Sequence, residues 1–368
     1  MQSYESPRTG VLSALQVRRG GARLVDLGLL GVALAWGSSY LAAKIATGLG
    51  PVPVVLLGRY ALSAVACVLI AGLASRTTGR PLVTRAELKA GVLLGTTQAA
   101  VLVLETWGVA GTSAANAGVL ISFTIILTPI IEASLGGSLP RRFFLAAGVS
   151  VAGIAVLTGA GGLTGLRAGD LLVLAAALVR AGNVVLIGRL SARSREHDRD
   201  RDRAQLRPLN LTMAQMVVGT ACTLPLAVPD LTRAPHALGS PEFWAVVAFL
   251  ALGCSVFAFL VQTWGVQQTS ASRASLLLGT EPVWAVLVAL TVGGEHLTAV
   301  ALTGCLLILA SCWWGQSIEA AHRRRSEGMR AVTDAAFLSA ERPVAPAPVP
   351  PSSRPEGQPR RTHGSARY

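Results

Sequence analysis

Residues 107–114 read WGVAGTSA, and residues 264–271 read WGVQQTSA. The two stretches lie 157 residues apart, and Gly136-Gly137 falls on Gly293-Gly294 in the same register. Chance gives occasional matches of small residues between apolar segments, but two blocks with a shared spacing are harder to explain that way. The chain is therefore predicted to contain an internal repeat.

Apolar stretches of about 20 residues recur along the chain, which is the length a helix needs to cross a hydrocarbon core of about 30 Å. We count ten, with approximate cores at residues 26–47, 54–74, 89–109, 113–136, 143–160, 169–189, 209–228, 242–265, 272–292 and 298–315. Composition agrees, since 52% of the 368 residues are hydrophobic, 14% are charged and the mean hydropathy is +0.54. These values exclude an ordinary soluble domain and predict an all-α integral membrane protein with ten transmembrane helices.

Basic residues are distributed unevenly between the segments that join these spans. With the N-terminus inside, 27 of the 32 Lys and Arg residues fall in cytoplasmic segments, whereas Arg167 and Arg233 fall outside. Cytoplasmic loops of membrane proteins carry such an excess. The pattern predicts a multi-pass protein of the cell inner membrane with both termini in the cytoplasm.

The repeat divides the ten spans into two groups of five. An odd number of helices makes the second copy enter the membrane in the opposite sense, which gives the inverted repeat found in many transporters. We predict a cytoplasmic segment at 1–24, one five-helix repeat at 25–160 and a second at 169–316. A charged cytoplasmic loop at 190–208 interrupts the second repeat, and a largely disordered Pro/Arg-rich tail covers 317–368.

Several function classes lack the residues they require. The formal charge of +13 is spread in short clusters between apolar runs and not gathered on one face, so we expect no nucleic-acid partner. The five cysteines lie in apolar stretches without a CxxC pattern or a histidine at ligand spacing, so no metal is expected. No HExxH, GxSxG or P-loop occurs, which argues against an enzyme, a cofactor and direct ATP-driven transport.

Ionisable residues inside spans are candidates for function because a charge in the bilayer costs at least about 2.5 kcal/mol unless it is paired or reaches water. Lys44, Arg59 and Glu105 fall toward the outer ends of their spans. They form either a functional charged cluster near the outer face or a snorkelling group that fixes helix ends. Arg180 and Glu281 fall near mid-depth, where we expect them to approach each other and take part in coupling.

Other candidates for the substrate pathway lie in the same spans. Pro282 breaks its helix and frees backbone carbonyls, which suits a gate or a site lining as well as a plain kink. Trp36 and Trp284 are deep enough to stack on a substrate, and core packing explains them equally well. Asn116 and Asn183 either bind substrate or join helices by hydrogen bonds, and we expect the second role.

A set of short motifs resembles the EamA-like branch of the drug/metabolite transporter superfamily. The residues that carry the likeness, in chain order, are Trp36-Gly37-Ser38-Ser39-Tyr40 with Lys44, Arg59, Thr112 to Ala117, Gly169-Asp170, Glu281-Pro282 and Gly294-Glu295. The likeness covers about residues 25–316 and implies ten helices in two five-helix repeats. Pro129 lies four residues beyond the position that matches Pro282, Arg180 stands where this family often has tryptophan, and Ser138 replaces a glutamate of the first half.

Together these observations predict a secondary transporter that exports small metabolites, amino acids or drug-like compounds by alternating access. Its expected partners are a small-molecule substrate and membrane lipid, and a homodimer is compatible with the sequence. The alternative from another class is a non-transporting membrane sensor or scaffold whose working part is the tail. A membrane-embedded enzyme is the third and weakest hypothesis.

Overall fold

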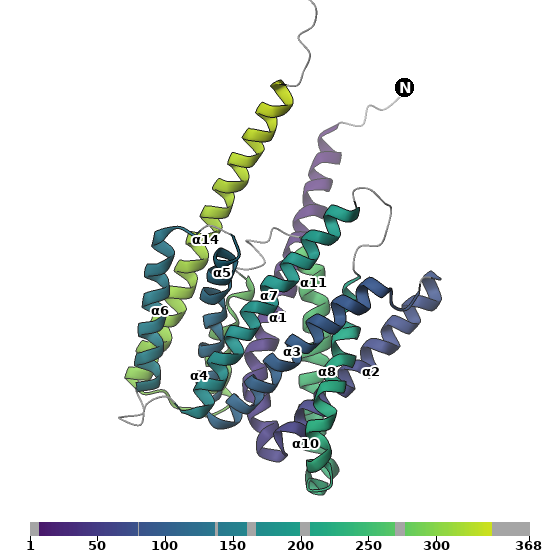
Figure 1. Cartoon of the computed structure of the whole chain (residues 1–368), viewed down its shortest axis with the longest axis vertical. Helices are drawn as coiled ribbons and strands as arrows, with labels where there is room; N and C mark the ends of the chain where they lie inside the picture. The colour runs from purple at the N-terminus through teal and green to yellow at the C-terminus, as the bar shows by residue number, and fades with distance from the viewer. Residues whose placement is uncertain are drawn as a thin grey trace, which may run out of the picture. The chain divides into compact units, whose positions relative to one another are not determined.

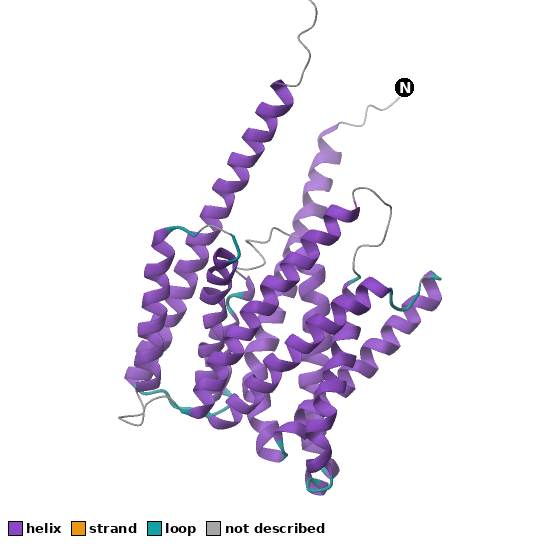
Figure 2. Cartoon of the chain, in the orientation of Figure 1, coloured by secondary structure: helices purple, strands orange, loops and turns teal. Residues whose placement is uncertain are grey.

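The computed structural model describes residues 7–79, 81–136, 139–159, 167–198, 207–268 and 277–340. These residues form helices and short connections, and no strand occurs among them (Figure 2). The chain divides into two compact units, Met1–His322 and Arg323–Tyr368. The first unit is a helical bundle, and the described part of the second is the C-terminal portion of one long helix.

Helices occupy all ten predicted spans at least in part. In the first half they are α1 (Pro7–Leu49), α2 (Val52–Thr78), α3 (Arg85–Gly111), α4 (Ala114–Leu120), the 3-10 turn η1 (Ile121–Phe123), α5 (Thr124–Ser134) and α6 (Arg141–Gly159). In the second half they are α7 (Ala168–Asp198), α8 (Pro208–Leu231), α9 (Pro235–Gly239), α10 (Pro241–Ala248), the π-helix η2 (Phe249–Phe257), α11 (Ala258–Gln268), α13 (Glu281–Thr291) and α14 (Ala299–Ala340).

Eight helical segments of the described residues are long and apolar enough to cross a membrane. The other two predicted spans hold α6, with 19 residues, and α13, a shorter apolar helix of 11 residues. Residues 269–276, which include the start of the ninth predicted span and part of the second repeat motif, lie outside the described residues. The structure is therefore that of a multi-pass membrane protein, and the count of ten stays a prediction.

Three helices extend far beyond the predicted spans, into segments predicted to lie outside the membrane. The segment 190–208 is not a loop throughout, because α7 continues to Asp198. The predicted N-terminal and C-terminal segments also contain helix, since α1 begins at Pro7 and α14 ends at Ala340. Hydropathy indicates only the part of a helix that lies in the apolar layer of the membrane. The hydrogen-bonded helical backbone can continue beyond that layer into polar sequence.

Local sequence accounts for several helix ends. Thr84 caps α3 in a capping box, with its side chain accepting from the Glu87 N–H while the Glu87 carboxylate accepts from the Thr84 N–H. Ser113 caps α4 by accepting from the Asn116 N–H. Gly79 ends α2 with a φ of +65°, a conformation that glycine adopts without strain.

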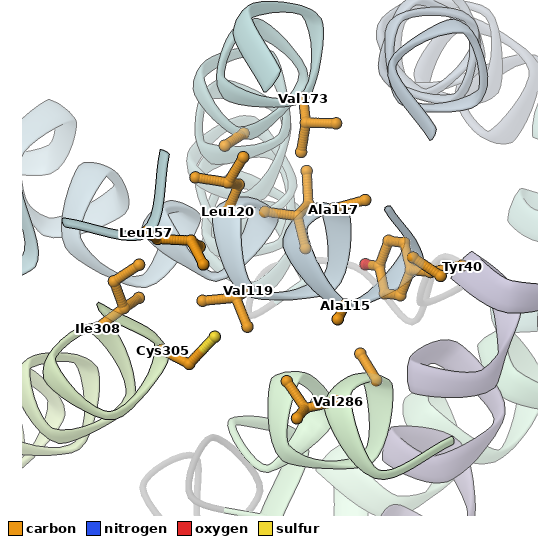
Figure 3. Packing of buried hydrophobic residues seen from close by; sticks show 14 of the residues in the cluster. Tyr40, Ala115, Ala117, Val119, Leu120, Leu157, Val173, Val286, Cys305 and Ile308 are labelled. Carbon is orange, nitrogen blue, oxygen red and sulfur yellow. The ribbon is translucent and has the colours of Figure 1, made fainter. Parts of the chain in front are cut away.

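The core joins helices from both halves of the chain. In the first unit, α2 packs along α8, and α3 packs along both α7 and α8 (Figure 1). One cluster of buried residues combines α1, α4, α6, α7, α13 and α14, as shown by Tyr40, Val119, Val286 and Cys305 (Figure 3). Small residues allow close contact there, since a Cβ added to Gly118 of α4 would lie 2.2 Å from Ala285 Cβ of α13.

Candidate substrate site

Arg180 and Glu281 lie in direct contact where α7 meets the start of α13. Arg180 Nη2 donates to Glu281 Oε2 at 3.1 Å, and Arg180 Nη1 donates to Glu281 Oε1 at 3.3 Å. This is the bidentate arrangement that a guanidinium forms with a carboxylate. The expected pairing is present, and its part in transport stays a prediction.

Helix α1 contributes two aromatic residues to this pair. Tyr40 Oη donates to Glu281 Oε1 at 2.6 Å, and Arg180 Nη1 lies 3.5 Å from the same hydroxyl, to which it donates. The Arg180 guanidinium carbon also lies 5.4 Å from the centre of the Trp36 ring, within the range of a cation–π contact. Trp36 thus contacts a charged side chain and is not only a packing residue.

The π-helix η2 fixes the orientation of Trp36. Trp36 Nε1 donates to the Cys254 carbonyl at 3.0 Å, and Cys254 lies within η2. A π-helix shifts its backbone bonds from the usual i to i+4 pattern and often marks a functional position. The site therefore depends on an irregular segment of the second half as well as on α1, α7 and α13.

The break before α13 places Glu281 in the first turn of that helix, with Pro282 directly after it. Proline is well tolerated there, because the first N–H groups of a helix have no intrahelical partner. Trp284 lies two residues after Pro282, and its Nε1 is enclosed by protein with no hydrogen-bond partner among the described residues. The break thus gathers a charge, a proline and an unpaired donor.

The three charges assigned to the outer ends of their spans do not form an ion-paired cluster. Lys44 donates to the carbonyls of Val109, Ala110 and Thr112 and so occupies the C-terminal end of α3, a position that favours a cation. Arg59 and Glu105 are instead buried, at 5% and 8% exposure. Among the described residues none of the three forms a salt bridge.

The two asparagines differ in their surroundings. Asn183 on α7 accepts from Thr97 Oγ1 at 2.7 Å and donates to Gln98 Oε1 at 3.0 Å, so its side chain joins α7 to α3. Asn116 lies in the first turn of α4, half-buried, where its backbone N–H is capped by Ser113. Asn183 has the helix-joining contacts expected for it.

Sequence reasoning missed Tyr40 as a site residue and Glu87 as a contact between helices. Tyr40 carries no charge and is one of many aromatic residues in apolar segments, so only its place in the quoted motif singles it out. Glu87 is 1% exposed and accepts from Arg207 Nε at 3.1 Å and from Asn210 Nδ2 at 3.3 Å. Its capping-box pattern, Thr84 to Glu87, was a visible signal.

Comparison with known protein families identifies one family, which matches both halves of the chain. The model of the EamA-like transporter family matches residues 23–159 and again residues 167–314. The chain belongs to the EamA-like transporter family. The family model matches each half of this EamA-like chain once, and Arg180 and Glu281 both lie in the second match.

Two individual proteins are similar to this EamA-like chain. An uncharacterized transporter of Archaeoglobus fulgidus is 27% identical over 302 residues, which covers 79% of this chain and 87% of that protein. A solved structure, titled only as the crystal structure of a protein, matches with a TM-score of 0.49 and 20% identity, over 78% of this chain and 96% of that chain.

Proposed function

We propose that this EamA-like protein is a secondary transporter that exports small metabolites, such as amino acids or drug-like compounds, by alternating access. In this proposal ten spans form two inverted five-helix repeats in the inner membrane, with both termini in the cytoplasm. The family and the archaeal relative named as a transporter support the class. The two separate family matches support the division into repeats.

The observation that carries the proposal is the contact of Arg180 with Glu281 and Tyr40. It joins α1 of the first half to α7 and α13 of the second half, next to the break at Pro282. Inverted-repeat transporters place their sites at discontinuous helices where the halves meet. When Arg180 is drawn away, the Glu281 carboxylate becomes available to a proton or a cationic substrate, which would couple binding to the change of access.

Counterflow into liposomes that contain the purified protein tests this function. A panel of labelled amino acids and organic cations is expected to include at least one compound that accumulates faster than in protein-free liposomes. A chain ending after Glu327 separates the transporter from the sensor or scaffold. Full flux by the shortened chain would exclude the scaffold, and absence of flux for the whole panel, with binding also absent, would contradict the transporter.

A further inference from the structure

The connection between α3 and α4 is held by charged side chains from three other segments of the chain. Glu295, in the segment after α13, accepts from the Ala114 N–H at 2.7 Å and from the Ala115 N–H at 3.0 Å. One carboxylate thus caps the start of α4 with both of its oxygens, and such charge-assisted bonds are strong. Gly294, with a φ of +62°, and a bond from the Glu295 N–H to the Ala289 carbonyl form the turn that positions this side chain.

Two more charges hold the same connection on its α3 side. The Thr112 hydroxyl donates to Asp170 Oδ1 at 2.6 Å, and Asp170 is a buried residue in the first turn of α7. Lys44 of α1 donates to the Thr112 carbonyl and, at 3.2 Å, to the Val109 carbonyl. We refer to Lys44, Asp170 and Glu295 together as the latch. Because Asp170 and Glu295 belong to the second half of the chain, the latch joins the two halves.

The backbones of α3 and α7 approach each other closely beside the latch. A Cβ added to Gly169 of α7 would lie 2.6 Å from the Gly108 carbonyl oxygen and 2.6 Å from the Gly111 carbonyl carbon, both of α3. A larger residue at 169 would therefore keep the two helices apart. Because α3 is the third predicted span and the N-terminus is assigned to the cytoplasm, this end of the bundle is external in the topology proposed above.

The internal repeat places a second copy of this helix contact at the opposite end of the bundle. The offset of 157 residues places Gly108 on Gly265, and an offset of 144 residues places Leu29 on Val173. The contacts agree with these registers. A Cβ on Gly108 would lie 2.6 Å from Val173 Cγ2, and a Cβ on Gly265 would lie 2.8 Å from Leu29 Cδ2. Helix α11 therefore meets the start of α1 as α3 meets the start of α7.

The second copy lacks most of the latch. In the same registers the aspartate and the threonine occur in both halves, as Asp170 with Thr112 and as Asp26 with Thr269. The lysine and the glutamate of the latch, and the glycine of the close approach, occur only once. The residues that match Lys44, Glu295 and Gly169 are, in the same order, Gly188, Ser138 and Val25. Thr269 and Ser138 lie outside the described residues, so for them the comparison is one of sequence.

We propose that the latch is the external gate of the transporter and that its incomplete cytoplasmic copy makes the externally closed state the resting state. This inference rests on the alternating access proposed above and adds which residues close one end and which state is favoured. Contacts that form in one of two states, without a match in the other, shift the population toward that state. The Glu87 contact joins α3 to α8 and involves neither α1 nor α11, so it does not replace the missing residues.

Hydrogen exchange of the purified full-length protein, without substrate, measures the balance between the two closures. The reporters are the backbone amides of residues 108–117 at the external end and of residues 258–268 of α11. Ser138→Glu supplies the carboxylate that the second copy lacks. It is expected to slow exchange in 258–268 and, from the opposite end of the bundle, to speed exchange in 108–117 by about fivefold, the population change that one helix cap typically gives.

Two further variants complete the test. Glu295→Gln keeps one acceptor oxygen, weakens the latch and is expected to speed exchange in 108–117 while it slows exchange in 258–268. Ser134→Glu adds the charge four residues before Ser138, at an exposed position that matches no latch residue, and is expected to leave both reporters unchanged.

The decisive observation is whether a change at one end of the bundle acts on the other end. An effect of Ser138→Glu confined to 258–268, or of Glu295→Gln confined to 108–117, would overturn the proposal, because a plain helix cap acts only on its own helix. No transported compound is needed for this measurement. A failed counterflow assay therefore does not decide it, and its own failure leaves the proposed transport function standing.

Discussion

At the scale of single residues, the chemistry centres on the Glu281 carboxylate. Arg180 and Tyr40 donate to it from two other helices, and the Arg180 guanidinium faces the Trp36 ring. A buried ion pair adds little stability by itself, but removal of one partner leaves an uncompensated charge. Replacement of Arg180 or Glu281 alone is therefore expected to lower the stability of the folded protein, whereas replacement of both by apolar residues is expected to be tolerated.

We expect Arg180→Leu to lower the free energy of unfolding by about 3 to 5 kcal/mol, because it strands Glu281. The double variant Arg180→Leu/Glu281→Leu is expected to regain most of that loss while substrate flux stays absent. Thermal unfolding in detergent measures the first effect, and counterflow measures the second. Arg233→Leu, an exposed arginine, is the control. Full flux in the double variant would assign the pair a purely structural role.

At the scale of elements, α3 and α8 are joined at their N-terminal ends. The Glu87 carboxylate accepts from the Thr84 N–H at 2.8 Å, from the Arg207 N–H and Nε at 3.1 Å, and from Asn210 Nδ2 at 3.3 Å. One side chain thus caps α3 and holds the start of α8, at the end of the bundle next to the charged segment. This contact connects helices from the two halves.

We expect Glu87→Ala to lower the free energy of unfolding by about 3 kcal/mol, since it removes a capping contact and leaves Arg207 without its carboxylate partner. Glu242→Ala changes an exposed carboxylate in the first turn of α10 and is expected to have little effect. Thermal unfolding of the two variants side by side measures the difference. Equal stability of both would show that the Glu87 network does not hold the two helices together.

At the scale of the whole molecule, eight of the segments predicted from hydropathy contain, among the described residues, helices that are long and apolar enough to cross a membrane. The predicted core 54–74 lies inside α2, and the deep charges led to Arg180 and Glu281. The π-helix η2 was not predictable, because its backbone pattern depends on packing against other elements and not on local propensity. Tyr40 was missed as a site residue for a related reason, since only the fold brings its hydroxyl to Glu281.

Site-directed cysteine labelling tests the arrangement of the whole chain in a background without the five native cysteines. We expect Asp198→Cys and a cysteine in the tail to react only with reagent on the cytoplasmic side, and Pro235→Cys to react only from outside. This outcome follows from the distribution of Lys and Arg. Labelling of Asp198→Cys and Pro235→Cys from the same side would contradict the inverted-repeat topology.

The most direct test of the central claim is counterflow by Glu281→Gln as a function of pH. The amide keeps the shape of the side chain but removes its charge and its ability to take a proton. The account predicts a protein that inserts and folds but loses substrate flux or the pH dependence of that flux. Normal, pH-dependent flux in Glu281→Gln would contradict the assignment of this carboxylate as the coupling site.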